Sequence, residues 1–150
     1  MVSTVDPRAS DRATRVLQVL LVTAIAVSIV HYADNTIRWD EYTQGNDTGL
    51  ITRPVIPISW VVFTVAGIAG YLLHRRGRWP LAAACLGFYS VSGLISLGHF
   101  TEVSPADFDA FQLTFVVLDF VLGAAILAYA LWLAVAGGRA SNQPAEAGAI

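Results

Sequence analysis

Charged residues are scarce in this sequence, and lysine is absent. Charged residues supply 13% of the 150 residues, about half the share of a typical soluble domain, whereas apolar residues supply 55%. The polar residues gather in short stretches that alternate with four long apolar ones, which predicts an integral membrane protein rather than a water-soluble domain. An arginine- and alanine-rich sequence without lysine is also typical of a GC-rich bacterial genome, so we expect a bacterial protein.

The sequence also has few of the residues that common soluble chemistries need. Its one cysteine, Cys85, cannot form an intrachain disulfide, and its place in an apolar stretch favours a buried thiol. Glycine-rich nucleotide loops, haem-attachment motifs, zinc ribbons and serine nucleophile elbows are all missing. Nucleic acid is not expected as a partner. Lipid, ion and protein binding in a membrane are therefore the functions to weigh.

The four apolar stretches predict four transmembrane helices in one domain, residues 1–150. Each stretch is close to, or longer than, the roughly 20 residues that an α-helix needs to cross a hydrocarbon core of about 30 Å. The expected fold class is all-α, a four-transmembrane-helix antiparallel bundle. We place the helices at about 13–36, 55–75, 79–100 and 106–137, with flexible tails at 1–12 and 139–150.

The positions of the arginines predict the orientation of the chain. Seven lie before the first apolar stretch, between the second and third, or after the fourth: Arg8, Arg12, Arg15, Arg75, Arg76, Arg78 and Arg139. Only Arg38 and Arg53 fall on the other side, among acidic residues. Because cytoplasmic flanks retain positive charge, we expect a bacterial plasma-membrane protein with both termini in the cytoplasm. Tyr32 and Tyr42 are expected at the outer interface as aromatic anchors.

Polar side chains share one face on three of the predicted helices. They recur at steps of three, four or seven residues, the spacings that align side chains on a helix. These residues are His31, Asp34 and Asn35 in the first helix, Ser96, His99 and Glu102 in the third, and Gln112 and Asp119 in the fourth. All three faces end on the outer side. The sequence therefore predicts an outward-facing polar pocket that binds an ion, a lipid headgroup or a small polar ligand.

Asp119 is the most unusual residue of this set, because it lies within an apolar span. At about 1.5 Å per residue it is roughly 13 Å below Ala110, underneath the lipid headgroups. A carboxylate at that depth is costly unless it is paired, neutral or hydrated. Asp119 is therefore a candidate proton site, ligand-binding residue or partner for His99.

Two histidines near carboxylates also predict a metal site. His31 with Asp34, and His99 with Glu102, are i, i+3 pairs of a kind that helical bundles use to hold metals. Imidazole and carboxylate together suit a divalent ion such as zinc. In this alternative the protein is a metal-dependent membrane hydrolase that acts on a lipid or amide at the outer face. Glu102 and Asp119 are then its candidate catalytic bases.

Further interpretations stay open beside these. In one interpretation, the histidine–acid pairs have a purely structural role, as hydrogen bonds that hold helices together. Alternatively, Asp119 titrates in a proton or ion carrier, which requires a homo-oligomer because one four-helix bundle has little room for a pore. The expected partners are the lipid bilayer and either a second copy or a membrane protein to which this chain is an accessory subunit.

The connections carry local turn and cap signals. Gly77 is placed to close the tight turn between the second and third helices, and Pro80 suits the first turn of the helix that follows. Ser104 is expected to cap the fourth helix. Gly123, within that helix, is expected to allow close approach of a neighbour.

Overall fold

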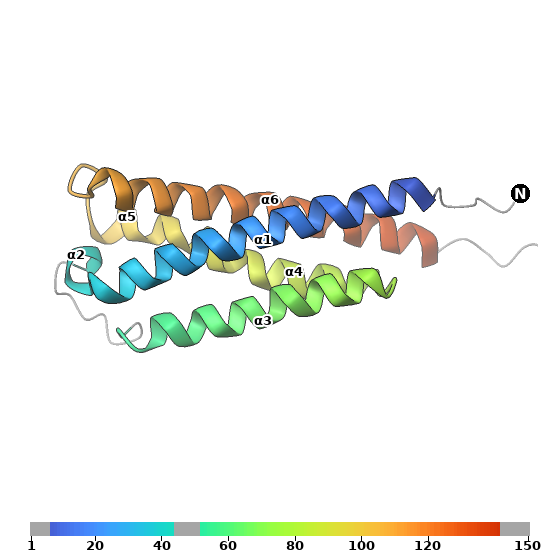
Figure 1. Cartoon of the computed structure of the whole chain (residues 1–150), viewed down its shortest axis with the longest axis horizontal. Helices are drawn as coiled ribbons and strands as arrows, with labels where there is room; N and C mark the ends of the chain where they lie inside the picture. Colours follow the sequence, from blue (N-terminus) through green and yellow to red (C-terminus); the bar gives the residue numbers. More distant parts are fainter. Residues whose placement is uncertain (1–6, 44–51, 142–150) are drawn as a thin grey trace, which may run out of the picture.

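The computed structural model describes residues 7–43 and 52–141, and this part of the chain is built from helices without strands. The four long helices are α1 (Pro7–Ile37), α3 (Val55–Arg75), α4 (Trp79–Leu94) and α6 (Ala110–Ser141). The three short ones are α2 (Trp39–Thr43), the 3₁₀ helix η1 (Ile95–Gly98) and α5 (His99–Glu102). The long helices alternate in direction, so α1 begins at the same end of the molecule at which α6 finishes (Figure 1).

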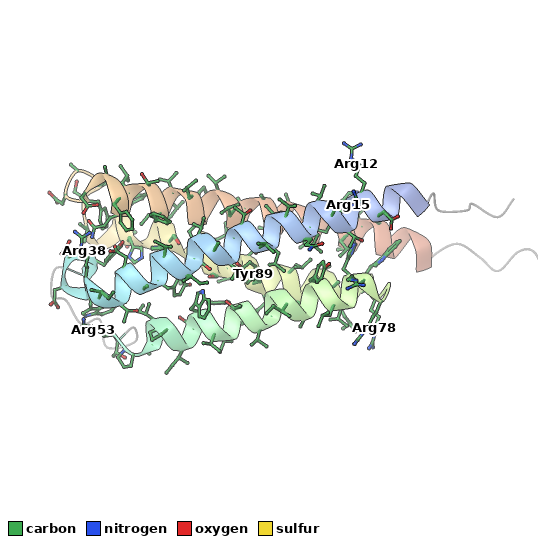
Figure 2. The ribbon with its side chains drawn as sticks, in the orientation of Figure 1. Arg12, Arg15, Arg38, Arg53, Arg78 and Tyr89 are labelled. Atoms are coloured by element: carbon green, nitrogen blue, oxygen red, sulfur yellow. The ribbon has the colours of Figure 1, made fainter. Side chains whose placement is uncertain are left out.

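The two ends of the molecule differ in charge. Figure 2 shows Arg12, Arg15 and Arg78 at one end, which we call the arginine end, and Arg38 and Arg53 at the other. At that second end Arg38 lies among the carboxylates of three acidic residues: Asp34, Glu41 and Asp109. We call it the acidic end. It also holds α2 and α5 (Figure 1).

The long helices pack in a square. α1 contacts α3 and α6, and α4 contacts the same two helices. The apolar core lies toward the arginine end and includes Leu17, Leu21, Leu86, Ile126 and Leu133. Most buried polar side chains lie toward the acidic end, beside a second, smaller apolar cluster that includes Tyr42 and Phe108.

Four helical segments among the described residues are long and apolar enough to cross a membrane. They are Asp11–Ile37, Val55–Arg75, Trp79–Thr101 and Ala110–Ala136. Large apolar side chains also cover the outward faces of these helices, with Val19, Ile58 and Leu131 each about 60% exposed. The prediction of four long apolar helices is thus confirmed.

α4 and α6 approach each other closely at two glycines. A Cβ atom on Gly93 would overlap the backbone oxygen of Asp119, and one on Gly123 would lie 2.9 Å from the Cα of Gly93. Only glycine permits this backbone-to-backbone contact, so the expectation for Gly123 is confirmed. The contact places the backbone of Asp119 directly against α4.

The turn between α3 and α4 follows the sequence signals. Gly77 has a φ of 70°, in the left-handed region that glycine adopts without strain. Its N–H donates to the oxygen of His74 at 3.0 Å, and the N–H of Arg78 donates to the oxygen of Leu73 at 2.9 Å. This pair of bonds is a Schellman cap. Pro80 then lies in the first turn of α4, as predicted.

Two helices extend beyond their predicted bounds. α1 begins at Pro7 rather than near residue 13, because proline suits a first helical turn and the following residues contain no helix breaker. α6 continues to Ser141 rather than 137, since elongating a helix adds a hydrogen bond for each residue that is fixed. The remaining parts of the predicted tails, residues 1–6 and 142–150, lie outside the described residues.

The predicted start of the fourth helix is wrong. Ser104 accepts a hydrogen bond from the N–H of Asp107 at 2.9 Å, which forms a turn instead of a helix. α6 begins only at Ala110, and the Asp109 side chain is its cap. The N–H of Gln112 donates to Oδ1 of Asp109 at 2.8 Å, and the N–H of Asp109 donates to Oε1 of Gln112 at 3.0 Å. This reciprocal arrangement satisfies two N–H groups that a helix start leaves free.

The predicted third helix is not continuous. It is an α-helix only to Leu94, tightens to a 3₁₀ helix over Ile95–Gly98, and resumes as α5. A 3₁₀ helix turns about 120° per residue where an α-helix turns about 100°, so four residues rotate His99 by roughly 80° relative to a continuous α-helix. The predicted stripe from Ser96 to His99 is therefore broken, and the two side chains take different partners.

Candidate functional site

The polar residues predicted on three helices meet at the acidic end. α1 supplies His31 and Asn35, η1 supplies Ser96, and α6 supplies Gln112 and Asp119. All five are at most 5% exposed. Asp34 and His99 lie at the same end and are half-buried. The structure thus brings together all the predicted site residues whose side chains it describes; the side chain of Glu102 lies outside the described part.

The centre of the site is a buried pair between α1 and α6. His31 Nδ1 donates to Oδ2 of Asp119 at 2.8 Å, and the hydroxyl of Ser96 donates to the same oxygen at 3.2 Å. The side chains of His31 and Asp119 are 2% and 4% exposed. Two donors thereby stabilise a carboxylate that would otherwise be costly in an apolar environment. Asp119 therefore pairs with His31 rather than with His99.

Two buried polar atoms beside this pair are unsatisfied. Nε2 of His31 and Oδ1 of Asn35 have no hydrogen-bond partner within the described part of the protein. The amide nitrogen of Asn35 lies 3.0 Å from Nε2 of His99, and the His31 and His99 ring centroids are 5.5 Å apart. Both unsatisfied atoms thus belong to side chains that contact His99. An unmade hydrogen bond on a buried group costs about 1–3 kcal/mol.

Tyr42 covers the two histidine rings. It is fully buried, and its ring centroid lies 4.8 Å from that of His99 and 6.2 Å from that of His31. Its hydroxyl donates to Oδ2 of Asp34 at 2.7 Å. Burial, followed by the hydrogen bond to Asp34, raises the pKa of Tyr42 above its usual range, so the hydroxyl stays a donor. The anchoring role predicted for Tyr42 and Tyr32 is wrong, because both rings are buried in protein and do not face lipid.

α2, which carries Tyr42, is tied to α1 and α6 by Arg38. The guanidinium donates to Asp109 at 2.8 Å and to Glu41, and it lies 3.8 Å from Asp34. These hydrogen bonds, to Glu41 first, raise the pKa of Arg38. The backbone N–H of Gln112, followed by Arg38, lowers the pKa of Asp109. We call these ion pairs, together with the Tyr42–Asp34 hydrogen bond, the α2 clasp.

Sequence reasoning missed the α2 clasp. Arg38, Glu41 and Tyr42 fall in a segment without helical periodicity, so their convergence with α6 was not visible. One signal was available: Arg38 is one of only two arginines that the sequence places on the acidic side of the predicted bundle. A solitary cation among carboxylates is a candidate ion-pair centre.

Some residues of the predicted pocket and metal site form hydrogen bonds with other groups of the protein. The Gln112 side chain accepts from the N–H of Asp109 and donates to Glu41 at 3.2 Å. Asp34 holds Tyr42. Among the described residues, no three histidine, cysteine, aspartate or glutamate side chains are grouped so as to hold a metal ion.

Polar contacts reach from the acidic end to about the middle of the helices. Tyr32 donates to the Ser92 backbone oxygen at 3.3 Å, and the indole N–H of Trp60 donates to Ser28 at 3.1 Å. Tyr89 lies near the middle of the molecule (Figure 2). Beyond it, toward the arginine end, the apolar core begins.

Comparisons of the chain with protein-family models, curated proteins and solved structures give no match.

Proposed function

We propose that this is a four-span integral membrane protein of a bacterial plasma membrane, with both termini in the cytoplasm. Two features support the proposal: the four long apolar helices and the apolar side chains on their outward faces. The arginine end then faces the cytoplasm, and the acidic end faces outward. An assembly with a second copy or another membrane protein stays a prediction.

Cysteine labelling tests this orientation. In a Cys85→Ser background, a cysteine introduced at Asp107 should react with a membrane-impermeant maleimide on intact cells, because Asp107 lies at the acidic end, between the third and fourth spans. A cysteine at Arg76 should react only after the membrane is opened. The opposite pattern, or equal labelling of both positions, would contradict the orientation.

We propose further that the acidic end binds a small polar ligand or ion through His31. The observation that carries the proposal is the state of the His31 ring. Asp119 fixes Nδ1, while Nε2 is buried and unsatisfied. An imidazole held at one nitrogen with the other nitrogen free is the arrangement by which proteins present histidine to a ligand. Asp119 is thereby a positioning residue for His31.

A purely structural role for the histidine accounts for less of the geometry. A hydrogen bond that only locks α1 to α6 needs the His31–Asp119 contact and nothing more. It leaves two unsatisfied atoms on neighbouring side chains, although the large majority of buried polar groups in proteins are paired. A ligand at this end explains why two side chains that both contact His99 each leave a polar atom unsatisfied.

The carrier alternative has less support than ligand binding. A proton or ion that reached Asp119 from outside would next meet buried apolar side chains, among them Leu17, Leu21 and Leu86. The polar contacts therefore open toward one end of the molecule rather than connecting both ends. This asymmetry favours a binding site on the outer side.

Access to the site requires movement of α2, because Tyr42 covers both histidine rings. The test is chemical modification of imidazole by diethyl pyrocarbonate in right-side-out vesicles, followed by mass spectrometry. We expect His31 or His99 to react, and to react faster in Tyr42→Phe, which keeps the ring but loses the hydrogen bond to Asp34. His74 at the arginine end is the internal control. If neither His31 nor His99 reacts in either protein, the binding proposal is wrong.

A further inference from the structure

A groove of about 470 Å³ lies on the outer surface of the molecule between α1 and α6, toward the arginine end. Most of its wall comes from α1, with one residue from α6. The residues that line it are Arg15, Val16, Val19, Leu20, Thr23 and Leu122. Val16 and Val19 are 51% and 67% exposed, so the groove opens outward and not into the apolar core. In a membrane, the neighbour of such an open apolar groove is a lipid chain.

The groove has the length of about one lipid leaflet. Arg15 lies one helical turn inside the first span, which begins at Asp11. From Arg15 to Thr23 the groove follows α1 over about 12 Å, at 1.5 Å per residue. One leaflet contributes roughly 15 Å to a hydrocarbon core of about 30 Å. The groove therefore suits an acyl chain that descends from the headgroup region beside Arg15.

Arg15 brings a positive charge to this groove that no carboxylate of the described residues neutralises. Within the described part of the chain, the ion pairs with carboxylates are those of His31 and Arg38, both toward the acidic end. Figure 2 shows Arg12 near Arg15 at the arginine end. Arginine lays its apolar stem along apolar surface while its guanidinium reaches the headgroup region. The groove thus has an unpaired cation at its mouth.

A second groove lacks this combination. It has a volume of about 380 Å³, lies between α1 and α3 toward the acidic end, and its wall includes Ile29, Tyr32 and Trp60. No charged residue lines it. It can therefore accept the chain of any lipid without a preference for the headgroup. The groove beside Arg15 joins an apolar wall to a cation, which selects the headgroup as well.

We infer that the groove between α1 and α6 binds one anionic phospholipid of the cytoplasmic leaflet, with an acyl chain along Val19 and Leu122 and the phosphate at Arg15. The inference rests on the proposed four-span topology, which places the arginine end at the cytoplasmic leaflet, where anionic lipids lie. Guanidinium and phosphate form charge-assisted hydrogen bonds, and the apolar wall gives the chain dispersion contacts. A zwitterionic lipid supplies the same chain, but its own cationic group offsets the attraction to Arg15.

The test is native mass spectrometry of the purified full-length protein in detergent. The protein is titrated with phosphatidylglycerol and, separately, with phosphatidylcholine that carries the same acyl chains. The first phosphatidylglycerol should bind about fivefold more tightly than the first phosphatidylcholine, the effect of one basic side chain near an anionic headgroup. This comparison uses the wild type, so it stays decisive if a substitution prevents folding.

Matched variants separate the charge from the groove. Arg15→Gln should remove the preference for phosphatidylglycerol, whereas Arg78→Gln, at the same end but outside the groove, should keep it. Val19→Trp fills the groove at an exposed position and should weaken binding of both lipids. Ile29→Trp makes a similar change in the second groove and should leave the preference in place.

Equal affinity for the two lipids overturns the inference, as does a preference that Arg15→Gln leaves unchanged or that Arg78→Gln reduces equally. Labelling of the cysteines introduced at Asp107 and Arg76 reads the topology independently of lipid binding. A missing lipid preference together with the expected labelling pattern therefore removes the lipid site and leaves the four-span topology in place. The opposite labelling pattern overturns the assignment to the cytoplasmic leaflet.

Discussion

The two ends of the molecule each bury a histidine, but they surround it differently. At the acidic end, His31 is bound by a carboxylate, lies beside a second imidazole and is covered by Tyr42. At the arginine end, His74 lies 3.2 Å from the Thr14 hydroxyl and 5.9 Å from the Tyr129 ring centroid. Both rings have one unsatisfied nitrogen within the described residues.

This comparison shows that an unsatisfied nitrogen alone does not define a site. His74 contacts one hydroxyl and one aromatic ring, which suits a polar contact between α1 and α3. His31 has a partner that fixes its tautomer, a neighbouring amide oxygen and a negative surrounding charge. The difference between the ends therefore lies in the groups around the histidine, and substitutions at the two ends should have different consequences.

The largest difference should appear in stability. Asp119→Ala removes one partner of a buried pair and should lower the free energy of unfolding by about 3–5 kcal/mol. His74→Ala removes a hydrogen bond to a neutral group and should cost only about 1 kcal/mol from that source. Equilibrium unfolding in mixed detergent measures both. Equal losses in free energy from Asp119→Ala and His74→Ala would show that the His31–Asp119 pair contributes no more than the neutral contact of His74.

A smaller effect is expected from the hydroxyl of Tyr42. Tyr42→Phe loses a hydrogen bond to a carboxylate, which should destabilise the protein by about 1.5 kcal/mol. Because the bond holds α2 over the histidines, modification of His31 and His99 should become faster while that of His74 does not change. Tyr129→Phe is the matched control, since it removes a hydroxyl at the arginine end that donates to Ala13. Faster modification in both variants would mean general loosening.

The ion pairs of the α2 clasp should affect access more than stability. Arg38→Gln removes the guanidinium that joins α2 to Asp109, and should speed modification of His31 modestly. Arg53→Gln is the control at the same end, because Arg53 donates to the Thr36 and Ile37 backbone oxygens at the end of α1 instead. The Arg38 effect should shrink in high salt, since exposed ion pairs are screened. An equal response to both substitutions would contradict the role of the clasp.

The smallest effect is expected from pH. The pKa of Asp109 lies below its ordinary value of 3.8, so its ionised form stabilises the fold. That contribution is complete above pH 3.8 and is lost as the pH falls through the lowered pKa. The ¹⁹F resonance of 5-fluorotryptophan at position 39 should therefore be constant from pH 7 to 5 and change only below about 4. Asp109→Asn should remove much of that change; an unaltered transition would assign it to another group.

Much of the fold was predictable because it follows local pattern. Helix lengths come from runs of apolar residues, and the turn at Gly77 comes from the one residue that adopts positive φ easily. The meeting of His31, Asn35 and Asp119 was also predictable, since each lies at a similar depth on a polar helix face. What periodicity could not supply was the partner of each side chain.

The incorrect predictions share a physical cause: each depends on contacts that the local apolar pattern does not reveal. The 3₁₀ helix over Ile95–Gly98 lies where α4 meets α6, and contacts between distant segments leave no local signal. The burial of Tyr42 depends on α2, a five-residue helix too short to show periodicity. Asp109 rather than Ser104 caps α6 because its partner Gln112 lies three residues ahead, a pairing that the apolar pattern alone does not reveal.

The most direct test of the site is ¹⁵N NMR of the histidine ring nitrogens in the full-length protein. His31 should be protonated at Nδ1, which donates to Asp119, and should carry a bare lone pair at Nε2. In Asp119→Asn this tautomer preference should weaken. A His31 ring protonated at Nε2 would contradict the presentation of Nε2 to a ligand.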